Sequence, residues 1–518
     1  MKCTCFVKNK DEAPCREARQ QEKLGGYGVD VVENPILSGT GEHVSFCKGH
    51  DCYYILSYHR EGAISLYEST DLVNWTTKQQ QINHMLGAQH ITSLTLRYHQ
   101  DQYYLLYALE EYYFLTCTKQ LSDSWQTPYA LCQTNQALSL FLDENQLYLL
   151  IERSSSPDNF RSLELQQLDL QTYEFIKQPM CLYYYESETP LQNCQLIKRE
   201  GYYYLSFTIM GDQTVQDVLL RSQTLSKGYR KHPQTALMCS PLDNHLNRVG
   251  YGKLFESFEG HWYFIHQCQR PLPCEKHVHF PLGFELALQN IVWESEWPYL
   301  RGFRTTAYDQ VFLYLEKIKH KRSRINYVIG DARFQTDFHC QTVREAGVLQ
   351  LEEDELVVNP HANQFKQLLF RHQEDFQFEF GFKMNHEPHQ NEQQAGLIYR
   401  YDDHNFHYVY STYNEKAQQK VLNVASVQDG KRVIHLDEGI CYEGEVEIWL
   451  RTTGEKATFY FQNRIGSFER IGPTLDICQL LTGSSAKALS MGMYTEDTET
   501  KPKTRFRDIF YVRRPFKS

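Results

Sequence analysis

The sequence predicts a five-bladed β-propeller followed by a β-sandwich, and three observations carry this prediction. A two-part phrase recurs five times along the first part of the chain. The composition includes 36 Tyr and 29 Phe, residue types that favour strands. In the last part of the chain, apolar and polar residues alternate with the period of half-buried strands. The protein is therefore expected to be all-β, with two kinds of sheet architecture.

The repeated phrase consists of an aromatic strand and then a turn that ends on an aromatic residue. The aromatic strands are CYYILSYHR, QYYLLYALE, QLYLLIERS, GYYYLSFTI and GHWYFIHQC, which start at Cys52, Gln102, Gln146, Gly201 and Gly260. The closing aromatics are Trp75, Trp125, Phe175, Tyr229 and Trp293. A period of about 45 to 60 residues built from such strands is typical of propeller blades. The Asp/Ser-rich turns argue against a single large sandwich, so we predict five blades over residues 31–310.

The remaining segments complete the domain organisation. Residues 1–30 are charged and lack periodicity, which predicts a loose N-terminal arm. Residues 311–329 include the charged stretch EKIKHKRSR and are expected to form a linker. Residues 330–518 hold closely spaced alternating stretches, for example FQFEFGFKM and GEVEIWLRT, and are predicted to form the β-sandwich.

Charge and hydropathy exclude several classes of function. The formal net charge of −11 leaves no basic stripe for a phosphate backbone, so nucleic acid is not an expected partner. No apolar run is long enough for a membrane span, and the first residues lack the apolar stretch of a secretory signal. The protein is therefore expected in the cytoplasm, away from membranes.

The cysteines predict neither a disulfide scaffold nor a metal site. Fifteen Cys is an odd number without framework spacing, which favours reduced, buried thiols. Two groups could be offered as metal ligands, but neither has the paired spacing of a zinc site: Cys3, Cys5 and Cys15, and Cys274, His277 and His279. No Gly-rich phosphate loop is visible either, so we predict no cofactor and no metal.

The functional pocket of a propeller lies on its axis, so candidate site residues precede the aromatic strands. There the chain resembles glycoside hydrolase family 43, most closely the β-xylosidases and α-arabinofuranosidases with a C-terminal concanavalin-like sandwich. The resemblance rests on NPILSG, YHREGAISLYESTDLVNW, TLRYHQDQYYLLYA, SLFLDENQLYLL, KREGYYYLSF, WESEWP and, in the sandwich, EQQAGLIYRYDDHNFHYV and RFRDIFYV. It implies an inverting glycosidase that removes pentoses from the ends of short oligosaccharides, using two carboxylates separated by a water molecule.

The carboxylates that the resemblance implies are missing from this sequence. By register from the flanking motifs, the family's Asp base falls on His43, its tuning Asp on Ala137 and its Glu acid on Gln192. A glutamine has no proton to donate to a leaving oxygen. The family's Gly-His-Ala-Asp phrase is also changed, because it reads Gly250, Tyr251, Gly252 and Lys253 here. We therefore predict no confident catalytic residue.

Three hypotheses follow for the function. The leading one is a non-hydrolytic relative that binds an oligosaccharide or another small carbohydrate through His43, Gln192, Tyr251 and Arg270. The second is an active exo-glycosidase on pentose oligosaccharides whose displaced carboxylates are Glu42 and Glu188, the latter within a Glu-Thr-Pro phrase that resembles the family's acid motif. The third is a propeller that binds a protein partner. The sugar, its linkage and the oligomeric state stay open.

Overall fold

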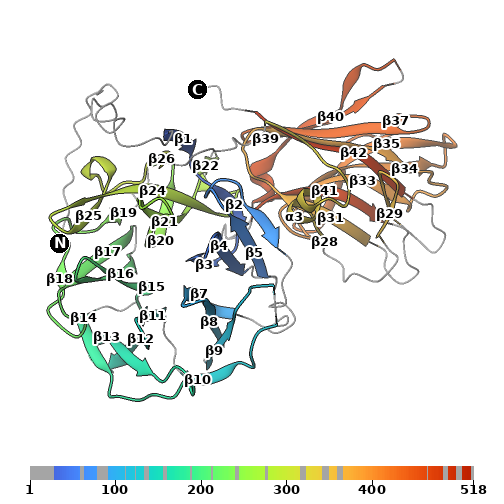
Figure 1. Cartoon of the computed structure of the whole chain (residues 1–518). Coiled ribbons are helices and arrows are strands. Elements are labelled where there is room, and N and C mark those ends of the chain that lie inside the picture. Colours follow the sequence, from blue (N-terminus) through green and yellow to red (C-terminus); the bar gives the residue numbers. More distant parts are fainter. Residues whose placement is uncertain are drawn as a thin grey trace, which may run out of the picture.

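The protein has two parts, a propeller and a sandwich that lies beside its first blade (Figure 1). The computed structural model describes residues 29–58, 64–78, 91–110, 112–122, 124–133, 139–155, 160–186, 190–211, 214–239, 244–274, 278–314, 323–340, 349–358, 366–463, 465–481, 488–496 and 504–514. Strands account for nearly all of the regular structure in these residues. The all-β prediction is confirmed.

The first three blades are four-stranded antiparallel sheets whose strands follow the chain order. Blade one contains β3 (His43–Lys48), β4 (Tyr53–Tyr58), β5 (Ile64–Ser69) and β6 (Thr76–Lys78). Blade two contains β7 (Ile91–His99), β8 (Gln102–Leu109), β9 (Tyr112–Thr118) and β10 (Tyr129–Gln133). Blade three contains β11 (Ser139–Asp143), β12 (Gln146–Ser155), β13 (Phe160–Leu168) and β14 (Met180–Glu186).

The last two blades differ in how they end. Blade four contains β15 (Gln192–Arg199), β16 (Tyr202–Met210), β17 (Val215–Ser222), β18 (Arg230–Lys231) and β19 (Met238–Cys239), and both short strands pair with β17. Blade five contains β20 (Asn247–Glu256), β21 (Trp262–Gln269), β24 (Phe284–Glu294) and β25 (Trp297–Leu300). Its fourth position is filled from the start of the chain, because β2 (Leu37–Thr40) pairs with β24. This pairing closes the ring.

The five aromatic strands of the sequence repeat are the second strands of the five blades, β4, β8, β12, β16 and β21. Alternate side chains of such a strand pack against opposite neighbours. In β4, Tyr53 and Ile55 contact the cluster shared with blade five, whereas Leu56 and Tyr58 contact the cluster shared with blade two. Because a strand points successive side chains to opposite faces, one aromatic strand buries both faces of its blade. The predicted five-bladed propeller is confirmed.

The innermost strands β3, β7, β11, β15 and β20 gather around the centre of the ring (Figure 1). Side chains tie neighbouring inner strands together. The Ser45 hydroxyl accepts from the Leu96 amide at 2.8 Å, joining β3 to β7. The Gln195 side chain donates to the Leu254 carbonyl at 3.0 Å and accepts from its amide at 2.9 Å, joining β15 to β20. These contacts fix the inner strands relative to one another.

The segments around the predicted linker are strands. β1 (Val29–Glu33) pairs with β26 (Gln310–Tyr314), so a piece of the expected N-terminal arm and a piece of the expected linker form a two-stranded sheet. β27 (Arg324–Asn326) pairs with the sandwich strand β42 (Thr504–Arg513). The sequence did not indicate these strands, because the region around the linker is charged and short paired segments need few apolar residues.

The sandwich consists of two antiparallel sheets around one core. The first contains β27, β29 (Leu349–Glu352), β30 (Glu355–Val358), β42, β32 (Phe378–Asn385), β38 (Val446–Thr453), β39 (Lys456–Gln462) and β40 (Phe468–Asp476). The second contains β28 (His339–Cys340), β31 (Lys366–His372), β41 (Ser490–Glu496), β33 (Gln394–Arg400), β34 (Phe406–Asn414), β35 (Gln419–Gln428), β36 (Lys431–Ile434) and β37 (Ile440–Cys441). Phe378, Phe380 and Phe382 of β32 are fully buried between the sheets. The predicted sandwich is confirmed.

Helices are few and short in the part of the chain that the structure describes: α3 (Ala332–Asp337) and the 3-10 turns η1 (Arg301–Phe303) and η2 (Ile477–Leu480). Among the described residues, no helix has the length and apolar character needed to cross a membrane.

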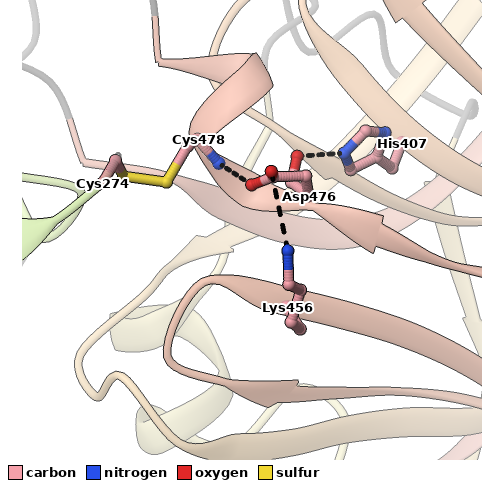
Figure 2. Close-up of a disulfide and its surroundings, with 5 residues drawn as sticks. All are labelled: Cys274, His407, Lys456, Asp476 and Cys478. Atoms are coloured by element: carbon pink, nitrogen blue, oxygen red, sulfur yellow. Dashed lines mark hydrogen bonds and ion pairs between the residues drawn. A yellow bond between two sulfur atoms is a disulfide. The ribbon is translucent and has the colours of Figure 1, made fainter. Parts of the chain in front are cut away.

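A disulfide joins the two parts of the protein. Cys274 follows β22 (Leu272–Pro273), which pairs with β23 (Val278–His279) on the propeller side, and it is bonded to Cys478 in η2 of the sandwich (Figure 2). Asp476 caps η2 by accepting from the Cys478 amide at 2.9 Å. This pair is an exception to the predicted reduced thiols, because two cysteines distant in sequence are brought together only by the docking of the sandwich.

Candidate functional site

Three of the predicted site residues lie on inner strands of the propeller. His43 is the first residue of β3 and Gln192 the first of β15, while Tyr251 lies in the middle of β20. In a propeller the starts of the inner strands surround the mouth of a central funnel. We call this region the funnel mouth, defined by His43, Gln192 and Tyr251 with the adjoining Glu42.

Gln192 places an amide side chain at the first position of β15. Its side chain is half-buried and makes no hydrogen bond within the described part of the chain. The backbone positions it through a bulge in the pairing of β15 with β16, in which Gln192 is opposite Thr208 and Asn193 has a φ of +50°. The Asn193 side chain secures this bulge by donating to the Gly252 carbonyl at 3.1 Å. The Gln192 amide can therefore donate to and accept from a ligand.

His43 and Glu42 lie across the mouth from Gln192's strand. The His43 ring stacks on Tyr58 with 6.2 Å between ring centroids, and both His43 and Glu42 are half-buried. Gln267 donates to the Glu42 carbonyl at 3.2 Å and so fixes the backbone before β3. Burial raises the pKa of Tyr251, and the carboxylates of Asp217 and Glu42 raise it further. The structure thus brings Glu42 and Tyr251 into one electrostatic neighbourhood.

Asp217 is a carboxylate near the mouth that the sequence did not single out. It lies on β17, is 3% exposed, and accepts from the Thr208 hydroxyl at 2.6 Å and the Gly252 amide at 3.4 Å. Its second oxygen is buried and has no hydrogen-bond partner in the described residues. Burial raises the pKa of Asp217 to about 6. That value would suit a general acid, but the carboxylate is directed at the backbone of β20 and not at the open mouth.

Gly252 allows this backbone approach. A Cβ atom at position 252 would lie 1.9 Å from the ring of Phe264. The strand therefore needs glycine here to pass between Asp217 and Phe264. Tyr251, directly before it, has a φ of +58°, and the Thr208 hydroxyl accepts from its amide at 3.0 Å.

Asp217→Asn is expected to change stability in a pH-dependent way. The folded pKa of about 6 lies above the ordinary value of 3.8, so the folded state holds this proton more tightly, and stability is lost as the pH rises from about 4 through 6. Asparagine does not ionise, so the Asp217→Asn variant does not lose stability as the pH rises through this range. The stability of the variant relative to the wild type should therefore rise by roughly 2 to 3 kcal/mol between pH 4 and pH 8. Denaturant unfolding across this pH range measures the difference.

Asp169→Asn serves as the control of opposite sign. The amides of Thr172 and Gln171 donate to Asp169 and lower its pKa, so its contribution to stability is present at neutral pH and lost as the pH falls. This variant should lose stability relative to the wild type as the pH rises. If the stability difference between Asp217→Asn and the wild type did not change with pH, the raised pKa of Asp217 would be contradicted.

Glu152 is a second carboxylate that sequence reasoning missed. It lies on β12, is 2% exposed, and accepts from the Leu191 amide at 2.9 Å, one residue before Gln192. Burial raises its pKa, whereas the Leu191 amide and Arg161 lower it, with Arg161 3.6 Å away. Through this hydrogen bond, Glu152 holds the backbone at the start of β15 in place. Its depth and its partners give it no open path to a bound ligand.

Arg270 is engaged in a structural ion pair. Its guanidinium donates to both oxygens of Glu285, at 2.9 and 2.7 Å, and to the Glu374 carbonyl of the sandwich at 2.7 Å. Burial is nearly complete for both charged groups, with side-chain exposures of 14% for Arg270 and 0% for Glu285. The position predicted for sugar binding therefore also anchors the sandwich to the propeller.

Several predicted residues fall outside the described part of the chain. These are Ala137, Glu188, His277 and the group Cys3, Cys5 and Cys15. Of the other proposed metal ligands, Cys274 is in the disulfide. Among the described residues, no group of three or more His, Cys, Asp or Glu side chains could hold a metal ion.

A cavity of about 340 Å³ lies away from the funnel, where blade one meets the sandwich. Its walls include Trp75 and Asn74 from the propeller and Arg371 and Glu374 from the sandwich. Arg371 is fully buried and donates to Glu374 at 2.8 Å and to the Tyr327 hydroxyl. This cavity belongs to the domain junction.

The five-bladed propeller with its appended sandwich is an architecture that solved structures share. The comparisons identify the family. Residues 32–298 match glycosyl hydrolases family 43, and residues 334–505 match the β-xylosidase C-terminal concanavalin A-like domain. The chain belongs to glycosyl hydrolases family 43, and the resemblance drawn from the sequence is confirmed.

Individual relatives are distant in sequence. Xylan 1,3-beta-xylosidase of Vibrio sp. is 25% identical over 312 residues, which cover 53% of this chain and 58% of that enzyme. Beta-xylosidase of Bacillus subtilis (strain 168) is 22% identical over 481 residues, covering 83% of this chain and 88% of that enzyme. The crystal structure of xylan beta-1,4-xylosidase from Bacillus halodurans C-125 matches with a TM-score of 0.74 and 23% identity, covering 93% of this chain and 100% of that one.

Proposed function

We propose that this protein is a member of glycosyl hydrolases family 43 that binds a carbohydrate at the funnel mouth without hydrolysing it. The observation that carries the proposal is Gln192, a half-buried amide with unused hydrogen-bonding groups at the position that the family resemblance gives to the general acid. An amide can recognise a sugar hydroxyl, but it cannot protonate a leaving oxygen. The relatives named as β-xylosidases favour a xylose-type sugar as the ligand.

The described carboxylates around Gln192 support the same proposal. Asp217 and Glu152 are both almost completely buried and accept from backbone amides. Hydrolysis with inversion needs one carboxylic acid at the leaving oxygen and one carboxylate that activates water on the other side of the sugar. Glu42, at the start of β3, is the described carboxylate that a rival active enzyme would use as its base.

Hydrolysis of aryl β-xyloside and aryl α-arabinofuranoside at high protein concentration tests the proposal. We expect no turnover above that of Glu42→Gln and Glu188→Gln variants. General acid and base groups each accelerate a reaction by a factor of about 10² to 10⁴. The triple variant His43→Asp, Ala137→Asp and Gln192→Glu should therefore hydrolyse these substrates at least about 10² times faster than the wild type. Wild-type turnover that either single variant abolishes would establish an active enzyme with displaced carboxylates instead.

Binding is tested separately by calorimetric titration with xylose and xylobiose. Gln192→Ala should weaken binding about fivefold, the loss of one net hydrogen bond of about 1 kcal/mol. Gln223→Ala is the matched control, because Gln223 is exposed on the same blade and donates to the Tyr202 hydroxyl far from the mouth. Absence of binding to both sugars would favour a protein partner for the propeller.

A further inference from the structure

Two basic side chains enter the centre of the propeller from inner strands. Arg97, on β7, donates to the Ser139 hydroxyl at 3.2 Å and so reaches the first residue of β11. Lys253, on β20, is two residues beyond Tyr251 and next to Leu254, whose backbone is held by Gln195 of β15. Both cations therefore lie below the funnel mouth, inside the ring of inner strands.

Among the described residues, the two cations have no neutralising partner. Lys253 is 5% exposed, and its ammonium group has no hydrogen-bond acceptor among the described residues. Arg97 donates to the Leu96 carbonyl and the Ser139 hydroxyl, both uncharged, which leaves several of its five N–H donors unused. In the described structure, no carboxylate contributes to the electrostatics of either side chain.

The nearby titratable group does not supply the missing charge. Cys47, on β3, is buried beside both cations, and burial raises the pKa of its thiol to about 12 even though Arg97 and Lys253 lower it. The thiol is therefore neutral at physiological pH. For Lys253, burial lowers the pKa well below its ordinary value, and the repulsion from Arg97 lowers it further. An anion beside the pair would oppose both effects, because its attraction raises the pKa of Lys253.

We propose that Arg97 and Lys253 form an oxyanion-binding site on the propeller axis, which takes a carboxylate or phosphate group. A guanidinium fork and a lysine ammonium are the donors that proteins use for such groups, and buried charges are ordinarily paired. The site goes beyond carbohydrate binding at the mouth and does not depend on it. The oxyanion can come from a free inorganic anion or from an acidic sugar whose neutral end occupies the funnel mouth.

Calorimetry and thermal unfolding of the full chain in phosphate-free buffer test the site, with phosphate, glucuronate and xylose as probes. Phosphate or glucuronate should bind the wild type and raise its unfolding midpoint by about 2 to 3 °C at a hundredfold excess over Kd. Lys253→Met should weaken that binding at least tenfold. It should also unfold cooperatively at an equal or higher midpoint without anion, because it removes a buried amino group that has no hydrogen-bond acceptor among the described residues.

Lys198→Met is the matched control, since Lys198 is partly exposed and pairs with Asp143 at 3.0 Å. It should bind the anions as the wild type does. Binding of glucuronate alone identifies an acidic sugar as the source, and binding of phosphate alone identifies a free anion; both support the site. Binding of xylose with neither anion would overturn the site and leave the proposed function intact. Undiminished anion binding by a folded Lys253→Met would also overturn it.

Discussion

Glu285→Ala is expected to lower the free energy of unfolding by about 3 to 5 kcal/mol, because it leaves a buried guanidinium without its counter-charge. Glu285 accepts hydrogen bonds from two guanidinium nitrogens of Arg270. It also accepts a hydrogen bond from the Ser38 hydroxyl at 2.7 Å, and its side chain is completely buried. Ser38 belongs to β2, the strand that closes the ring, and Arg270 also contacts the sandwich. One carboxylate therefore supports ring closure and domain docking together. Denaturant unfolding measures the loss.

Glu296→Ala is the matched control for this prediction. Glu296 pairs with Arg199 at 3.1 Å, but its side chain is 45% exposed. Exposed pairs contribute about 0 to 1 kcal/mol, so this variant should be nearly as stable as the wild type. A similar small loss in both variants would show that the Arg270–Glu285 pair is not the anchor described above.

Removal of the disulfide has the second large expected effect. Cys274 and Cys478 are 204 residues apart in the sequence, so their bond closes a long loop. The chain-entropy account assigns such a loop about 5 kcal/mol, and native disulfides typically contribute about 2 to 5 kcal/mol. We expect Cys274→Ser, and the wild type in the presence of a thiol reductant, to lose stability within that range in denaturant unfolding.

Cys441→Ser controls for the substitution itself, because Cys441 is an exposed free thiol. It should change stability by less than about 0.5 kcal/mol. A wild type unaffected by reductant would contradict a stabilising role for the bond. The cytoplasmic localisation stays a prediction, and this disulfide weighs against it because disulfides persist mainly in oxidising compartments.

The architecture was predictable from the sequence because it repeats. Each aromatic strand buries both of its faces between neighbouring blades, so the same residue pattern had to recur five times. The strands β1 and β26 were not predictable, because their pairing joins segments about 280 residues apart and neither has a distinctive pattern. The disulfide was hidden for the same reason.

Only those site residues that lie within recognisable local motifs were predictable from the sequence. His43 and Gln192 were found from motifs directly before aromatic strands, and both lie at the starts of inner strands. Asp217 and Glu152 lie on third and second strands, and they reach the site through the packing of one blade on the next. A local sequence pattern does not indicate contacts of this kind between blades. Arg97 and Lys253 likewise become a pair only when β7 and β20 converge on the axis.

Ring closure by β2 also sets a condition on synthesis. Ser38 on β2 and Glu285 on β24 are 247 residues apart. At the usual rate of translation, roughly 12 to 50 s pass between the appearance of these two strands. Throughout that interval β2 has an unpaired edge, the kind of surface on which strands of other chains add. The yield of soluble protein should therefore depend on how quickly ribosomes traverse the propeller sequence and on what shields its first strand meanwhile.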